Sequence, residues 1–337
     1  MNTEPGAVVD AHVRAEFVAC SVDATMAAMT ERPAAKGLIC DSLPMNFDPL
    51  RTRKHWRKTF EPVADLPYAF MTGDRDGGQT MAFVRHTIDI NGCKLSFARA
   101  GTGQPLLYLH GTDGLAEWPA ILDALVERFD VIVPDHPGFG ASEGPAWVDD
   151  VSDVAYCYLD VIEALGLAGV HVVGQSLGGW IALEMAVRST HRLRSLTLIS
   201  AAGIHVKGVP KADIFMIDPE EQARLAYADP KRGAEAAERA GAEKYQDLAI
   251  LNRIASARFG WQPRFFNPRL ERWLHRVNIP TQIIWGEDDR IIPPAYAEAF
   301  HRLIPGSTLT MIPDAGHLPH VERTPVVAQA MQAFLRN

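Results

Sequence analysis

From residue 83 onward, short apolar segments alternate with longer amphipathic ones. The short segments are rich in Val, Ile and Leu without polar interruption, which is typical of strands buried on both faces of a parallel sheet. The longer segments repeat their apolar residues at three- and four-residue intervals, which predicts helices with one buried face. The alternation predicts an α/β fold, a mostly parallel sheet with helices on both faces.

The predicted elements follow from this pattern. The apolar runs predict strands at Thr87–Ile90, Cys93–Ala100, Pro105–His110, Phe129–Pro134, Val170–Gly174, Leu193–Ser200, Thr281–Trp285 and Ser307–Ile312. The amphipathic segments predict helices at Glu117–Arg128, Val151–Leu165, Pro294–Leu303 and Thr324–Arg336. The Asn91-Gly92 pair joins the first two strands and predicts a hairpin turn, because both residues tolerate positive φ.

The alternation is interrupted between residues 204 and 277. This segment is rich in Ala, Glu and Arg and predicts three helices, at Pro219–Tyr227, Lys231–Ala240 and Lys244–Phe259. We therefore expect a core formed by residues 83–203 and 278–337, with residues 204–277 as a helical cap (lid). Open α/β sheets bind ligands at the carboxyl ends of their strands, which is where such a cap would lie. Residues 1–82 predict an N-terminal extension of unassigned role.

Composition narrows the class of protein. The 337 residues are 47% hydrophobic and 22% charged, with a net charge of −8, so we expect no nucleic acid partner. No secretory signal or run near the ~18 apolar residues of a membrane span is evident, and four scattered cysteines predict buried free thiols in a cytoplasmic protein. The N-terminal extension could pack on the core or on a second subunit, so a homo-oligomer is allowed.

The most informative motif is Gly-x-Ser-x-Gly, formed by residues 174–178 around Ser176. A predicted strand precedes it and a helix-forming segment follows it, which is the context of a nucleophile elbow. In such a turn one hydroxyl is exposed beside the N-terminus of a helix. The amide of Leu177 begins that helix and would be a free hydrogen-bond donor near the serine.

A serine hydroxyl is a weak nucleophile until a base removes its proton, and the base must itself be oriented. Asp288 and Asp289 directly follow the predicted strand that ends at Trp285, and His317 follows the last predicted strand. The carboxyl ends of parallel strands meet at one edge of a sheet, so these side chains are candidates for one site with Ser176.

From Thr87 to Asn337 the chain resembles the α/β-hydrolase-fold serine hydrolases, on five motifs in the family's order. These are His110-Gly111, the segment Asp135–Ser142, the Gly-x-Ser-x-Gly elbow, Gly286-x-x-Asp289 and Gly316-His317. The resemblance implies that Ser176 is the nucleophile, His317 the general acid–base and Asp289 the orienting carboxylate. Asp289 is chosen because the family's acid stands three residues after the glycine, and Asp288 remains the alternative.

The resemblance also implies an oxyanion hole formed by the backbone N–H groups of Thr112 and Leu177. It implies no metal and no organic cofactor. His110 and Asp135 are expected to brace their loops by hydrogen bonds, and His136 and His320 to be structural or rim residues.

These residues predict hydrolysis of a small-molecule carboxylic ester or lactone through an acyl-enzyme intermediate. C–C bond hydrolysis of ring-cleavage diketones, a cofactor-free peroxidase activity, and a non-catalytic receptor or scaffold of the same fold stay open. Six apolar residues predict either an apolar pocket or a packed core within the cap: Phe215, Met216, Phe259, Trp261, Phe265 and Phe266.

Overall fold

A computed structural model describes residues 83–115 and 118–336. The N-terminal extension predicted for residues 1–82 lies outside this part of the chain. The described residues form an eight-stranded sheet of order β1-β2-β4-β3-β5-β6-β7-β8, in which every pairing from β4 to β8 is parallel. The strands are β1 (Val84–Ile90), β2 (Cys93–Ala100), β3 (Gln104–Leu109), β4 (Phe129–Pro134), β5 (Val170–Gln175), β6 (Leu193–Ile199), β7 (Thr281–Gly286) and β8 (Thr308–Ile312).

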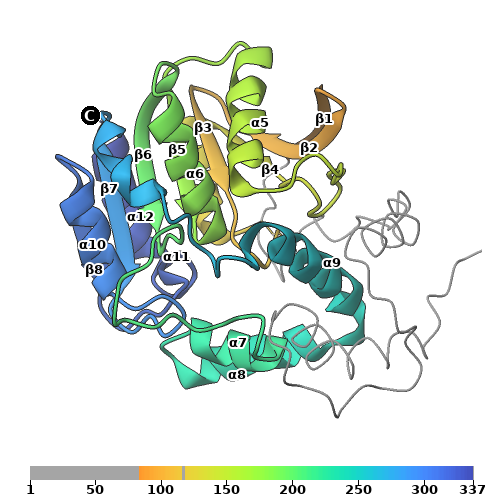
Figure 1. The fold of residues 1–337 in the computed structure, drawn as a ribbon, viewed down its shortest axis with the longest axis vertical. Coiled ribbons are helices and arrows are strands. Elements are labelled where there is room, and N and C mark those ends of the chain that lie inside the picture. Colours follow the sequence, from red (N-terminus) through yellow and green to blue (C-terminus); the bar gives the residue numbers. More distant parts are fainter. Residues whose placement is uncertain (1–82, 116–117, 337) are drawn as a thin grey trace, which may run out of the picture. The chain divides into compact units, whose positions relative to one another are not determined.

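Helices cover both faces of this sheet, which confirms the predicted fold class (Figure 1). Residues of α5 (Val151–Ala164), α6 (Leu177–Arg188) and α10 (Ala295–Leu303) share one hydrophobic cluster with the sheet. Residues of α4 (Ala120–Val126) and α12 (Thr324–Leu335) form a second cluster on the opposite face. Strands β5 and β7 are buried along their whole length, which agrees with their uninterrupted apolar runs.

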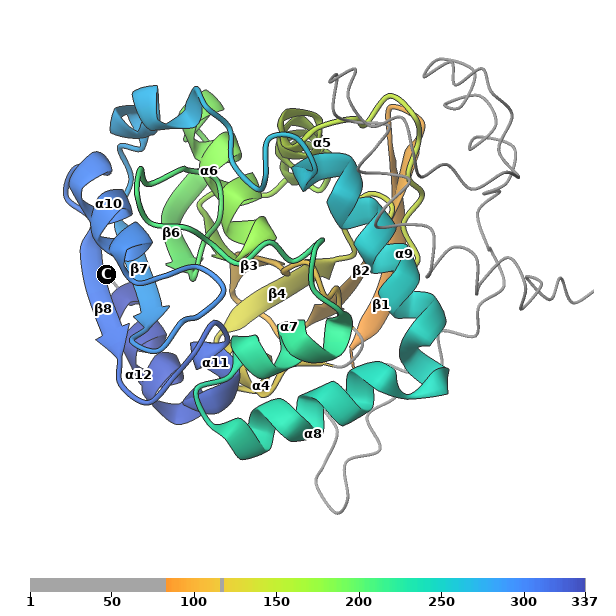
Figure 2. The ribbon, with the colours of Figure 1, turned by 60° about the horizontal axis from the view of Figure 1, so that its bottom comes forward.

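The segment between β6 and β7, residues 204–277, forms three helices and two short 3₁₀ turns. The helices are α7 (Pro219–Ala226), α8 (Pro230–Gly241) and α9 (Glu243–Gly260), followed by η2 (Leu270–Arg272) and η3 (Leu274–Arg276). Helices α7 and α8 each begin with an Asp cap before a Pro in the first turn, the combination that favours helix initiation. Figure 2 shows α7, α8 and α9 gathered on one side of the sheet.

The predicted elements differ from the structure mainly at their ends. Helix α4 starts at Ala120 and not at Glu117, after the Pro119 that occupies its N-cap. Helix α11 (Pro319–Glu322) has four residues, too few for its periodicity to be recognised in the sequence. Cys93 and Cys157 are free and buried as predicted, and the other two cysteines lie outside the described residues. No helix in the described ranges is both long and apolar enough to cross a membrane.

Candidate active site

Ser176 lies at the turn between β5 and α6. Its backbone has φ 52° and ψ −112°, a conformation that L-residues rarely adopt, and the first residue of α6 follows immediately. The turn requires close backbone contacts on either side: a Cβ added at Gly178 would lie 2.1 Å from the carbonyl oxygen of Leu109, and one added at Gly174 would lie 2.4 Å from that of Gly178. The two glycines of the motif therefore allow the sharp turn that presents Ser176.

The structure brings Ser176, His317 and Asp289 together from the ends of three strands. Ser176 Oγ lies 3.0 Å from His317 Nε2, and His317 Nδ1 lies 2.8 Å from Asp289 Oδ2. All three residues are at most 8% exposed. The imidazole therefore has one nitrogen on the hydroxyl and the other on a carboxylate, the arrangement in which Asp holds the tautomer that accepts a proton from Ser.

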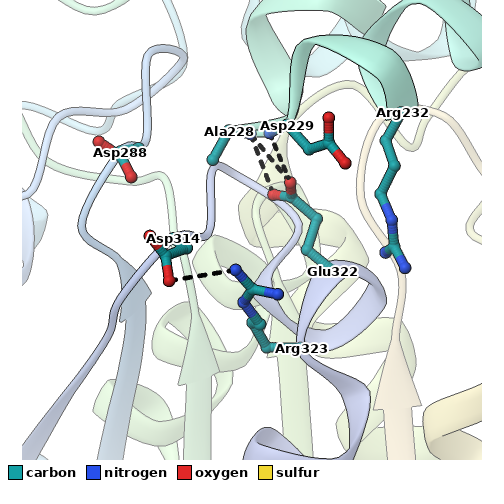
Figure 3. Close-up of a pocket in the computed structure, with 7 residues that line it drawn as sticks. All are labelled: Ala228, Asp229, Arg232, Asp288, Asp314, Glu322 and Arg323. Atoms are coloured by element: carbon teal, nitrogen blue, oxygen red, sulfur yellow. Dashed lines mark hydrogen bonds and ion pairs between the residues drawn. The ribbon is translucent and has the colours of Figure 1, made fainter.

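The two neighbouring aspartates have different surroundings. Asp289 Oδ1 accepts hydrogen bonds from the backbone N–H groups of Ile291 and Ile292, at 2.9 and 2.8 Å, which leaves Oδ2 for His317. Asp288 is exposed and lines a separate cleft (Figure 3). The structure therefore places Asp289 beside His317 and leaves Asp288 apart from it.

The loop that carries Thr112 is braced by two histidines. His110 Nδ1 donates to the Gly111 carbonyl at 2.7 Å, and His110 Nε2 accepts the backbone N–H of His136 at 3.2 Å. Burial lowers the pKa of His110, which keeps it neutral and suited to this donor-and-acceptor role. Because a trans peptide is planar, fixing the Gly111 carbonyl also fixes the direction of the Thr112 N–H, which points the opposite way.

The two predicted oxyanion-hole residues lie on different elements of the fold. Thr112 lines the same cavity as Ser176 and His317. Leu177 is the first residue of α6, where a backbone N–H has no acceptor within the helix. On the other side of the loop, Asn252 of α9 donates to the Asp113 carbonyl at 2.7 Å, which ties the loop to the inserted segment.

Asp135, the other residue expected to brace its loop, forms two such contacts, and His136 and His320 were expected to be structural or rim residues. Asp135 pairs with Arg85 at 3.0 Å and accepts the backbone N–H of Ala141. His136 Nδ1 lies 2.6 Å from the hydroxyl of Tyr158, and burial holds the pKa of His136 well below its usual value. His320 is buried, and burial lowers its pKa to about 3.

Ser176 and His317 open into a cavity of about 280 Å³ between the sheet edge and the inserted segment. Phe265 and Phe266 line this cavity, whereas Phe215 and Phe259 are buried in the hydrophobic core and Met216 is exposed. Of the aromatic residues singled out in the sequence, some therefore line the cavity and others belong to the packed core.

Sequence reasoning missed the charged groups of this cavity. Asp113 and Lys211 both line it, and Arg264 does so with its partner Asp213 at 3.0 Å. The surrounding protein raises the pKa of Asp113, an effect that His317 partly opposes. Burial lowers the pKa of Lys211 to about 8. No local motif surrounds Lys211, so only the folded arrangement could reveal its place in the cavity.

A second missed residue, Glu322, joins the inserted segment to the His317 loop (Figure 3). Its buried carboxylate accepts the backbone N–H groups of Ala228 and Asp229, at 3.0 and 3.1 Å, and that of Gly316 at 2.6 Å. The His317 N–H itself donates to the Ala226 carbonyl at 2.8 Å. These bonds hold the connection between α7 and α8 against the loop that carries His317.

Among the described residues, no cluster of three or more His, Cys, Asp or Glu side chains has the arrangement of a metal site.

The sequence and the fold of this chain were compared with those of known proteins. Residues 106–330 match the model of the alpha/beta hydrolase family. Lipase 3 of Moraxella sp. strain TA144 is 31% identical, over 69% of this chain and 78% of the lipase. The 2-hydroxy-6-oxo-6-(2'-aminophenyl)hexa-2,4-dienoic acid hydrolase of Metapseudomonas resinovorans is 26% identical, over 75% of this chain and 91% of that enzyme.

Among solved structures, a thermophilic esterase superposes with a TM-score of 0.60 at 25% identity, covering 76% of this chain and 98% of the esterase. The family match covers most of the chain, and it includes the strands that carry Ser176, Asp289 and His317. The chain belongs to the alpha/beta hydrolase family and is a hydrolase.

Proposed function

We propose that this protein is a serine hydrolase that cleaves carboxylic esters or lactones through an acyl-enzyme intermediate. The observation that carries the proposal is the position of His317, with one ring nitrogen 3.0 Å from Ser176 Oγ and the other 2.8 Å from Asp289. A hydroxyl, a base and a buried carboxylate in this order are the groups that acyl transfer requires.

In the first half-reaction, His317 takes the proton of Ser176 as Oγ attacks the substrate carbonyl carbon. The negative charge on the carbonyl oxygen is stabilised by the N–H groups of Thr112 and Leu177. His317 then donates the proton to the leaving alcohol oxygen, and an ester to Ser176 remains. Asp289 stabilises the imidazolium that forms between these two proton transfers.

In the second half-reaction, His317 removes a proton from water, whose oxygen attacks the acyl carbon. The same oxyanion donors act again, and the bond to Ser176 Oγ breaks with return of the proton from His317. The net reaction adds one water across one ester bond.

The inserted segment, residues 204–277, acts in this proposal as the cap that shapes the acyl or alcohol pocket. Its residues form much of the cavity wall, including Phe265 and Phe266. This division leaves residues 83–203 and 278–337 as the core that carries the reacting groups.

C–C bond hydrolysis is the second candidate, since a relative at 26% identity is named as a dienoic acid hydrolase. A substrate panel on the purified protein separates the two. It comprises p-nitrophenyl butyrate, γ- and δ-lactones and a ring-cleavage diketone, each with Ser176→Ala as background. Turnover of esters or lactones above that background supports the proposal, and turnover of the diketone alone would replace it. Turnover of none of them would count against both candidates.

A further inference from the structure

Lys211 stands out among the charged residues of the cavity. Its Nζ donates to the carbonyl oxygens of Phe265 and Ile204, at 2.9 and 3.3 Å. It also lies 5.6 Å from the ring centre of Phe266 and 5.5 Å from that of Tyr296, within the range of cation–π attraction. An ammonium has three N–H donors, so two carbonyl acceptors leave one donor for another partner.

No carboxylate in the described part of the chain pairs with Lys211. The neighbouring cation of the same cavity, Arg264, has such a partner in Asp213. The Lys211 side chain is half-buried, and a cation partly removed from water without a counter-ion carries a free-energy cost. That cost appears in the pKa of Lys211, which burial lowers. A ligand that brings a negative charge into the cavity would therefore gain a charge-assisted hydrogen bond at this position.

The backbone connects Lys211 closely to the reacting serine. The Ala202 N–H donates to the Ser176 carbonyl at 3.0 Å, and the next residue, Gly203, donates to the Phe265 carbonyl at 3.2 Å. Lys211 Nζ donates to that same Phe265 carbonyl. Lys211 and Ser176 thus face one cavity from adjoining parts of its wall.

We propose that Lys211 binds a carboxylate carried by the substrate, so that the preferred ester is a half-ester of a dicarboxylic acid or a similar carbonyl compound with a free carboxylate. This inference rests on the proposed esterase function and adds the substrate class to it. A carboxylate suits Lys211 because one of its oxygens can accept the remaining ammonium N–H while its single negative charge matches the single positive charge of Lys211.

The alternative role for Lys211 is a brace that joins the start of the inserted segment to the loop after α9. Such a brace would affect every substrate alike, because it acts through the shape of the cavity. A carboxylate partner would instead affect only substrates that carry the charge. The two roles are separated by the ratio of kcat/KM for a charged substrate to kcat/KM for a neutral substrate of the same shape. The ratio does not depend on the fraction of active protein in each preparation.

The test uses the monomethyl esters of succinate, glutarate, adipate and pimelate. Each is paired with a methyl ester in which an isopropyl group replaces the carboxylate, such as methyl 6-methylheptanoate for monomethyl adipate. For the best half-ester, Lys211→Met should lower the ratio of charged to neutral kcat/KM by about 10- to 150-fold, the range expected for one hydrogen bond to a charged group. Lys211→Arg should retain most of the ratio.

Lys207→Met is the matched control, because Lys207 is an exposed lysine of the same segment and does not line the cavity. It should leave the ratio unchanged. If Lys211→Met does not fold, Lys211→Gln takes its place, since the amide can still donate to the Phe265 carbonyl without carrying charge. Inhibition of neutral-ester hydrolysis by free adipate, weaker in that variant than in the original protein, would support the same assignment.

Equal losses for the charged and neutral esters in the Lys211 variants would overturn the carboxylate site while leaving the esterase proposal standing. The esterase proposal itself would be rejected if the unmodified protein hydrolysed none of these esters, neither in the two series nor p-nitrophenyl butyrate. The two failures are therefore distinguishable.

Discussion

Helix α6, behind Ser176, and helices α7 and α8 of the inserted segment differ in how they are held. Every residue of α6 from Leu177 to Val187 is buried, whereas α7 buries only Ala226 and α8 only Gly233 and Ala237. The reacting groups therefore rest on a tightly packed support. The inserted segment lines the cavity mainly through its loops, and its lightly packed helix α7 adds only Gln222 and Ala226. In the function proposed above, the core supplies the chemistry and the inserted segment shapes the choice of substrate. The exposed positions of α7 and α8 can change at little cost to folding.

The largest expected effect is the loss of the nucleophile from the packed side of this comparison. Ser176→Ala should lower kcat for the best ester by about 10⁴–10⁶, because no other group can form the acyl-enzyme. Steady-state kinetics with active-site titration measures it. Activity of the variant equal to that of the original protein would show that the reacting group lies elsewhere.

The next effect distinguishes the two neighbouring aspartates. Asp289→Asn should lower kcat by about 10⁴, because an amide in that position favours the wrong tautomer of His317. Asp288→Asn is the matched control and should change kcat by less than about twofold, since its side chain is exposed and lines the other cleft. A larger loss for Asp288→Asn would move the acid role to that residue.

Glu322 tests the junction between the two regions. Glu322→Gln should destabilise the protein by about 1–3 kcal/mol. In the original protein three backbone N–H groups bond to two carboxylate oxygens, and the amide of Gln offers them only one oxygen. It should also reduce kcat more than it raises KM, since the bond to Gly316 holds the His317 loop. Chemical denaturation and ester kinetics measure the two effects.

Glu235→Gln, at an exposed position of α8, is the control for the Glu322 variant and should change neither quantity. A destabilised Glu322→Gln protein whose kcat is unaltered would limit Glu322 to a role in folding.

The smallest expected effect is a pH dependence at Lys211, on the side of the cavity that the inserted segment forms. The pKa of Lys211 is about 8, so its charge is present below that pH and is lost above it. The preference for a half-ester over its neutral analogue should therefore decline as pH rises from about 7 to 10. A bound carboxylate stabilises the charged amine, so the decline in kcat should come at a higher pH than the decline in kcat/KM.

Lys211→Arg keeps its charge across this range and should keep a constant preference. That variant separates the titration of Lys211 from any contribution of the other ionisable groups around the cavity, which are Asp113, His205, Asp213, Arg264, Tyr296 and His317. A decline of the same size in Lys211→Arg would assign the pH dependence to one of those groups.

The sheet and the candidate catalytic residues could be predicted from the sequence because both have local sequence signatures. Buried parallel strands appear as apolar runs, and Ser176 and His317 stand in short motifs at strand ends. Lys211 and Glu322 have no such signature. The proposed role of Lys211 depends on its place in a cavity lined by residues distant along the chain, none of which is its counter-ion. The role of Glu322 depends on three backbone N–H groups from two separate segments that bond to its carboxylate. Such convergence exists only in the folded chain.

The central claim is that the hydroxyl of Ser176 is activated by His317, and covalent labelling tests it most directly. A fluorophosphonate probe should add one mass increment to the intact protein, and peptide mass spectrometry should locate it on Ser176. Ser176→Ala should remain unlabelled, and His317→Gln should label far more slowly. Labelling of a different residue, or equal labelling rates in the original protein and His317→Gln, would contradict the account.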